Sequence, residues 1–263
     1  MPEPETNKFK EVHEKFHAHV QPIATVPETD DWMYHYLLQN LARDIEPGFD
    51  VLDIGCGNGV LSLYCAKRGC HVLGIDISEK AAEASQIAAG NLGLSKHATF
   101  KAVPLEDLPD DQAYDLVVLS EVIEHIPDDV AAMKKIACIL KPGGKVYITT
   151  PSSYALAHRL RLLLFRHDDF DRRVGHVRRY TKESLAALVQ EAGLKQDYLT
   201  KGEGPFRNLL LTTRLHTIYD LMLRARLNRA FEFIDDRLMT PLLGEAQIML
   251  TAQKSKQDHG SKR

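Results

Sequence analysis

Val51-Leu-Asp-Ile-Gly-Cys-Gly-Asn-Gly59 decides the fold of this chain, because an apolar run ends in three alternating glycines and a helical pattern follows as far as Ala66. Glycine lets the backbone approach a ligand closely, since it has no Cβ to fill that space. The next apolar run ends in Asp76, about 20 residues after Gly55, where a carboxylate can accept hydrogen bonds from both hydroxyls of a ribose. The glycine spacing differs from the Gly-x-Gly-x-x-Gly pattern of dinucleotide sites, so it predicts a nucleoside site without a pyrophosphate cradle.

Strand-like and helix-like segments alternate on both sides of this loop. Short β-rich runs at 51–55, 71–76, 98–103, 115–120 and 145–150 are interleaved with helical patterns up to 66, at 79–92 and at 128–140. This alternation indicates βαβ units and an α/β fold with a doubly wound, mostly parallel sheet. Further along the chain, 182–192 is predicted as a helix and 246–252 as a last strand.

The domain plan follows from the places where this rhythm is lost. Residues 1–27 are predicted to be a loosely ordered N-terminal arm, and 28–253 a single domain whose first helix lies within 28–45. Two irregular stretches, 151–182 and 205–244, are predicted insertions, the second with a long helix from 209 to about 227. The polar tail 254–263 is predicted to be disordered.

Composition sets limits on the function. The chain has 263 residues, 44% of them hydrophobic and 26% charged, which excludes a disordered or fibrous protein. The formal net charge of −3 disfavours binding of nucleic acid by bulk charge. There is no signal-like or membrane-spanning apolar run, and the four cysteines have neither disulfide nor zinc spacing, so we expect a cytoplasmic protein.

The loop, the acid and their order in the chain resemble those of the class I S-adenosylmethionine (SAM) methyltransferases. The resemblance implies a Rossmann-like methyltransferase fold with a seven-stranded sheet and SAM as the cofactor. It also implies that the glycine loop passes the methionine part, the acid holds the ribose and the loop after the third strand holds the adenine. The cofactor-binding residues implied in this way are Asp53, Gly55, Cys56, Gly57, Asp76, Ile77, Val103, Pro104, Leu105 and Ser120. Pro104 stands where many members have an acid, so recognition of adenine would rest on backbone groups.

A second motif, Ser120-Glu-Val-Ile-Glu-His-Ile-Pro127, follows the fourth predicted strand. Glu121, Glu124 and His125 would share one face of a helical turn at the carboxyl edge of the sheet, which suits a divalent cation. His176 is the candidate fourth ligand. The alternative is that the segment only shapes the cofactor pocket.

With His176-x-x-x-Tyr-Thr-x-Glu183 downstream, this motif resembles the small-RNA 3′-terminal 2′-O-methyltransferases, in which two glutamates and two histidines hold magnesium. With Lys141-Pro-Gly-Gly144 it also resembles the ubiquinone-biosynthesis O-methyltransferases, which need a divalent cation. Both resemblances imply Mg²⁺ or another divalent cation on Glu121, Glu124, His125 and His176, with O-methylation as the reaction. The catalytic residues would be His125, His176 and Glu121, and a metal-free mechanism with a histidine base is the rival.

The insertion 158–182 carries eight basic and three acidic residues, a local charge of +5. It favours an anionic acceptor or peripheral contact with an anionic membrane, although a solvated helix face explains it equally well. We therefore predict a small or medium acceptor of the catechol, quinol, sugar or lipid-linked diol type, and an apolar 205–244 region that completes the pocket or a homodimer face. An RNA 2′-O-methyltransferase and a non-catalytic SAM-binding subunit are the alternatives.

Overall fold

The computed structural model describes residues 14, 17, 19–31, 33–166, 169–212 and 228–256. Its centre is one seven-stranded sheet in the order β3-β2-β1-β4-β5-β7-β6. The strands are β1 Asp50–Ile54, β2 His71–Asp76, β3 Ala98–Ala102, β4 Tyr114–Ser120, β5 Leu140–Pro151, β6 Leu194–Lys201 and β7 Gln247–Lys254. Strands β1 to β5 run parallel, and β7 is antiparallel to both β5 and β6. The predicted doubly wound, mostly parallel sheet is confirmed.

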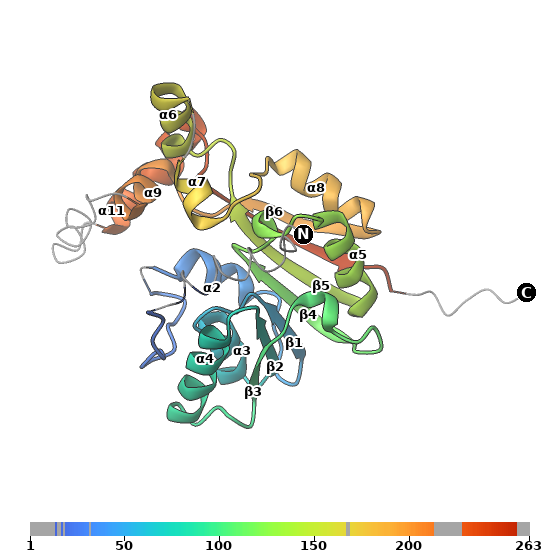
Figure 1. Cartoon of the computed structure of the whole chain (residues 1–263). Helices are drawn as coiled ribbons and strands as arrows, with labels where there is room; N and C mark the ends of the chain where they lie inside the picture. The colour runs from blue at the N-terminus through green and yellow to red at the C-terminus, as the bar shows by residue number, and fades with distance from the viewer. Residues whose placement is uncertain are drawn as a thin grey trace, which may run out of the picture.

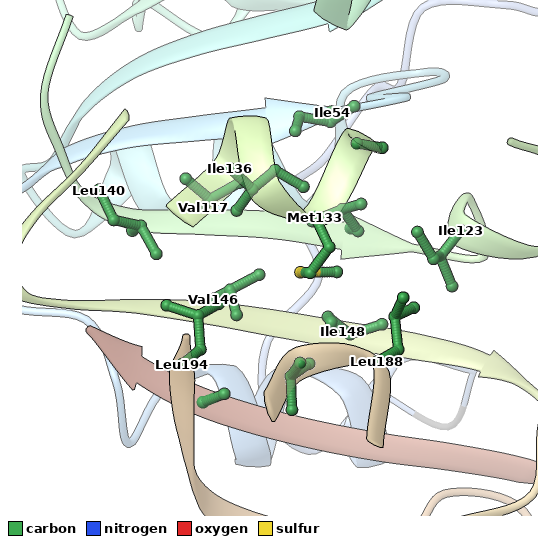
Figure 2. Packing of buried hydrophobic residues seen from close by; sticks show 14 of the residues in the cluster. Ile54, Val117, Ile123, Met133, Ile136, Leu140, Val146, Ile148, Leu188 and Leu194 are labelled. Carbon is green, nitrogen blue, oxygen red and sulfur yellow. The ribbon is translucent and has the colours of Figure 1, made fainter. Parts of the chain in front are cut away.

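Helices cover both faces of the sheet (Figure 1). One face carries α2 His35–Leu41, α3 Val60–Lys67 and α4 Glu79–Asn91, whose buried residues form a core cluster with β1 and β2. The other face carries α5 Asp129–Ile139 and α8 Lys182–Glu191. Figure 2 shows the core on this side, where Met133 and Ile136 of α5 and Leu188 of α8 lie over Val146 and Ile148 of β5.

The remaining helices lie in the two predicted insertions. They are α6 Leu156–Phe165, α7 Asp169–Val174, α9 Pro205–Thr212, α11 Asn228–Ile234, a π-helical turn Asp235–Met239 and α12 Thr240–Leu243. Helices α6 and α9 are in contact, and in Figure 1 they stand beyond one end of the sheet. The predicted helix 209–227 lies in part outside the described residues, as do most of the tail and residues 1–13 of the arm.

The structure differs from the sequence expectations at three elements. Strand β6 was not predicted, because it lies at the sheet edge and only one of its eight residues is buried, so it has no apolar pattern. The helical pattern to 140 and the strand run from 145 leave Lys141-Pro-Gly-Gly144 as a predicted turn, but in the structure it lies within β5, at a register shift against β4. Helix α2 covers only seven residues of the expected 28–45.

None of the helices in the described ranges is both long and apolar enough to cross a membrane. The four cysteines are free thiols, and Cys56, Cys65 and Cys70 are buried.

The packing shown in Figure 2 predicts how much stability is lost when a core side chain is shortened. Ile136 in α5 is fully buried, whereas Ile87 in α4 is 46% exposed. We expect Ile136→Ala to lower the free energy of unfolding by about 2–5 kcal/mol, because it removes buried methyl groups and leaves a cavity. The matched change Ile87→Ala should cost under about 0.5 kcal/mol. Urea unfolding of both variants measures the difference, and equal losses would contradict the packing described here.

Candidate active site

A cavity of about 1500 Å³ opens at the carboxyl ends of the parallel strands. In open α/β sheets this edge is where ligands bind. Among the predicted functional residues, those that line the cavity are Gly55, Gly57, Asp76, Ile77, Val103, Pro104, Leu105, Ser120, Glu121, His125 and His176.

The glycine loop after β1 has a backbone that favours glycine. Gly55 and Gly57 have φ angles of 65° and 54°, in the left-handed region. A Cβ on Gly55 would lie only 2.5 Å from Cγ2 of Val122, in the loop after β4. This position therefore excludes a side chain for two independent reasons, and the loop lies tightly against the Glu121–His125 segment.

Asp76 holds the loop from the neighbouring strand. Its Oδ2 accepts a hydrogen bond from the Gly57 amide at 3.0 Å, and its Oδ1 accepts one from the Ser78 amide at 2.9 Å. Each carboxylate oxygen has a second lone pair. The carboxylate is thus fixed at the cavity wall with acceptor capacity left for ribose hydroxyls.

Two predicted cofactor residues are not among those that line the cavity. Asp53 is buried, and its Oδ2 accepts a 2.6 Å hydrogen bond from the Ser62 hydroxyl of α3. Burial raises the pKa of Asp53 to about 7. Cys56 is also buried, and burial raises the pKa of its thiol. In this structure Asp53 therefore connects the end of β1 to α3, on either side of the glycine loop, and does not face the cavity.

Three of the four predicted metal ligands come together. One ligand atom each from Glu124, His125 and His176 lies within 4.8 Å of the others. Nε2 of His176 is 3.9 Å from Oε1 of Glu124, and the two imidazole rings meet edge to face with centroids 4.8 Å apart. His176 is distant from the other two residues in sequence. A 2.9 Å hydrogen bond from the Val177 amide to the Glu124 carbonyl holds its segment beside them.

Hydrogen bonds orient both imidazoles. Nδ1 of His176 is 2.8 Å from Oδ1 of Asp171, which Arg179 also contacts, and Nδ1 of His125 is 3.2 Å from the Gly175 carbonyl oxygen. The Arg179 and His176 partners lower the pKa of Asp171 despite its burial, so this carboxylate stays ionised. In both rings Nδ1 has a protein partner, and such contacts fix the orientation of an imidazole.

Glu121 lies apart from that three-residue group. The predicted helical turn is a single 3₁₀ turn, Ile123–His125, and Glu121 precedes it with φ at 57°. Its Oε1 accepts hydrogen bonds from Thr149 Oγ1 at 3.1 Å and from Gln247 Nε2 at 2.8 Å. Its backbone is thus in the left-handed region, which costs free energy for a residue other than glycine, and such strain concentrates at functional sites.

Burial dominates the electrostatics of the two glutamates. Burial raises the pKa of Glu121, although the hydrogen bonds from Gln247 and Thr149 lower it in part. Burial also raises the pKa of Glu124, and the negative charge of Glu121 raises it as well. Glu124 is fully buried, and its Oε2 accepts a hydrogen bond from Thr150 at 3.0 Å. Its Oε1 has no hydrogen-bond partner among the described residues.

Sequence reasoning missed several residues of this site. Thr149 and Thr150, at the end of β5, could have been found from the strand order, because β5 ends beside the Glu121 segment. Asp171 and Gln247 offered no motif. The cavity is also lined by His17 from the predicted arm and by Glu203 and Asn208 near α9.

Comparison with known proteins gives the class. Residues 30–199 match the family described as methyltransferase domain. The chain is 35% identical over 170 residues to the ubiquinone biosynthesis O-methyltransferase of Bordetella avium (strain 197N), covering 60% of this chain and 66% of the relative, just under two thirds of its length. It is 31% identical over 188 residues to the enzyme of that name from Acinetobacter baumannii (strain SDF), covering 65% of this chain and 77% of the relative.

A solved structure shows the same fold. Geranyl diphosphate C-methyltransferase from Streptomyces coelicolor A3(2), solved with Mg²⁺, geranyl diphosphate and S-adenosyl-L-homocysteine, superposes with a TM-score of 0.62 at 15% sequence identity. The alignment covers 94% of this chain and 97% of that protein.

A sheet of this order, with a glycine loop after β1 and an acid at the end of β2, defines the class of SAM-dependent methyltransferases. The chain belongs to the methyltransferase domain family, whose match covers more than half of its length. The predicted resemblances to class I SAM methyltransferases and to the ubiquinone-biosynthesis enzymes are confirmed, whereas the resemblance to the small-RNA enzymes stays a prediction.

The Asp76 geometry predicts the effect of a nearly isosteric change. In Asp76→Asn one acceptor oxygen becomes an NH₂ group, which faces the amide of either Gly57 or Ser78 and cannot accept from it. We expect S-adenosylhomocysteine to bind about 10–100-fold more weakly by calorimetry. Asp197→Asn, at an exposed position of β6, is the control and should bind as wild type. Equal affinities for all three proteins would show that Asp76 does not hold the cofactor.

Proposed function

We propose that the chain is a SAM-dependent O-methyltransferase that uses a divalent cation on Glu124, His125 and His176. One observation carries this proposal: His125 and His176 line the same cavity as the glycine loop and Asp76. A methyl donor on the loop and an acceptor oxygen near the imidazoles would therefore share one enclosed space. Relatives named as O-methyltransferases support the same reaction.

The residues at the site fit a cation. The Glu124 carboxylate is fully buried, and its Oε1 faces His176 Nε2 without a hydrogen-bond partner among the described residues. A buried carboxylate is costly unless a positive charge or donors offset it. The contact from Asp171 to the far nitrogen of His176 is the arrangement that orients a histidine ligand.

A bound divalent cation would lower the pKa of an acceptor hydroxyl and fix its oxygen. The residues of the chain itself would contribute by positioning the methyl donor and the acceptor. Asp76 and the glycine loop would hold the donor in the cavity that the two imidazoles also line, and methyl transfer would depend mainly on the alignment of donor and acceptor there. Glu121, held by Thr149 and Gln247 through one oxygen, leaves the other to orient the acceptor. Together with two imidazoles, a single carboxylate suits Mn²⁺, Fe²⁺ or Zn²⁺ as well as Mg²⁺.

The cavity wall near α6 and α7 supports a small or medium acceptor. It combines the apolar Ala155, Ala157, Phe170 and Val174 with Arg161. At least four of the eight basic side chains in 158–182 are committed to ion pairs within the chain: Arg172, Arg178, Arg179 and Lys182. This pairing reduces the charge offered to an extended phosphate backbone, so a compact acceptor is favoured over RNA. Membrane contact and a homodimer stay predictions, as does a cytoplasmic location.

Cation binding can be tested without knowing the acceptor. Chelator-treated protein titrated with Mn²⁺ should remove the free-ion signal in electron paramagnetic resonance. Glu124→Gln removes the charged ligand but keeps the shape, so we expect at least tenfold weaker binding. Glu191→Gln, whose carboxylate pairs with Lys134 on an exposed surface, is the matched control and should bind as wild type. If wild type does not bind Mn²⁺, or if Glu124→Gln binds equally well, the metal is excluded and a histidine base remains.

The reaction can be tested with SAM that carries a deuterated methyl group. Metal-loaded protein should convert a catechol to its labelled methyl ether and leave the analogue lacking one hydroxyl unchanged, because a single hydroxyl cannot be held in the same way. Mass spectrometry locates the label. Labelled nitrogen or carbon would contradict O-methylation, and methylation only of an RNA 3′ end would favour the RNA alternative. Tight SAM binding with no turnover across a panel of diol acceptors would favour a non-catalytic subunit.

A further inference from the structure

We propose that the described part of the N-terminal arm, residues 14, 17 and 19–27, covers the cofactor end of the cavity and that His17 is a SAM-binding residue. The inference rests on the proposed use of SAM but is independent of the metal, the acceptor and the reaction. Neither the glycine-loop motif nor the family match, which begins at residue 30, includes this segment.

The base of the arm is fixed to the domain by charge. Glu28 contacts Lys67 at 2.6 Å and Arg68 at 2.7 Å, both at the C-terminal end of α3. These pairs lower the pKa of the Glu28 carboxyl, so it stays ionised near neutral pH. Ion pairs as exposed as these contribute little to stability, but they place the end of the arm beside the C-terminal end of α3.

Apolar packing directs the middle of the arm along the sheet. Ile23 and Val26 are partly buried and pack against the core cluster that α2, α3 and α4 form with β1 and β2. This is the same face from which the glycine loop enters α3. The described residues between 19 and 28 are thus held against the domain along the route to the cofactor loop.

Two contacts near the start of the arm reach the two cofactor motifs. Oε1 of Glu14 accepts a 2.8 Å hydrogen bond from the amide of Glu79, the first residue of α4 after Asp76-Ile-Ser78. His17 lines the cavity, and a Cβ built on Gly57 would lie 3.8 Å from Cε1 of its imidazole. The arm therefore touches both the glycine loop and the end of β2.

The polar groups around His17 indicate which part of the cofactor it would bind. The cavity at Gly57 and Asp76 offers backbone amides and a carboxylate to a ligand, and an imidazole adds a donor or acceptor that neither motif supplies. Methionine carboxylate and ribose hydroxyls are the polar groups that SAM and S-adenosylhomocysteine would present there. With His17 in place, the cofactor would be enclosed between the glycine loop and the arm.

Calorimetry with S-adenosylhomocysteine tests the proposal on the full chain, without metal or acceptor. We expect His17→Ala to weaken binding about tenfold, as for the loss of one hydrogen bond to a ligand group. His19→Ala, two residues along the same arm and exposed, is the matched control and should bind as wild type. His17→Gln keeps a polar group and should recover part of the loss. Thermal unfolding of the ligand-free variants shows whether each is folded.

Hydrogen exchange supplies a second readout. Bound S-adenosylhomocysteine should slow amide exchange at residues 14, 17 and 19–27 in wild type and in His19→Ala, and should slow it less in His17→Ala. Unchanged affinity in a folded His17→Ala variant, or no ligand-dependent protection of the arm, would overturn the inference. Either result would leave the proposed methyl transfer intact, whereas failure of wild type to bind the ligand at all would remove the proposed function itself.

Discussion

The contact between Gly55 and Val122 is the constraint on which the rest of the site depends. Any side chain at residue 55 would collide with Val122, and the left-handed backbone there would resist it as well. Strands β1 and β4 are neighbours in parallel register, so the loops that leave them are pressed together at the sheet edge. The cofactor loop and the segment Glu121–His125 consequently form one packed unit, and a shift in one would displace the other.

That packing explains how a buried carboxylate can be kept at the centre of the site. The backbone carbonyl of Glu124 accepts a hydrogen bond from the Val177 amide, and its Oε2 accepts one from the Thr150 hydroxyl. Its Oε1 lies 3.9 Å from Nε2 of His176. Burial raises the pKa of its side chain, so the chain alone disfavours its ionised form. A cation would reverse that preference, because it offsets the lost hydration with direct coordination. Binding of a cation at the proposed site would therefore be linked to ionisation of Glu124.

How far the sequence predicts this site depends on how local each part is. The glycine loop, Asp76, and the strand ends are contiguous runs with their own periodicity, and the structure places them at one edge as parallel strands require. His176 was predicted through its motif, and the structure brings it to Glu124 and His125. Glu121 was predicted on a shared helical face, but the real turn is shorter and begins after it. Asp171, Gln247 and His17 join the site by tertiary contact alone, so no spacing in the sequence pointed to them.

The cavity also divides between what the family match covers and what it does not. The match ends at residue 199, and it contains the glycine loop, Asp76 and the cluster of Glu124, His125 and His176. Gln247 holds Glu121 from β7, and Glu203 and Asn208 line the cavity beyond that point. The orientation of the Glu121 carboxylate therefore depends on a residue outside the matched region. The family match therefore covers the glycine loop, Asp76 and the Glu124–His125–His176 cluster, and it leaves out the residues after 199 that also line the cavity. Residues in such segments carry little general sequence signal, so a family match does not predict what they bind.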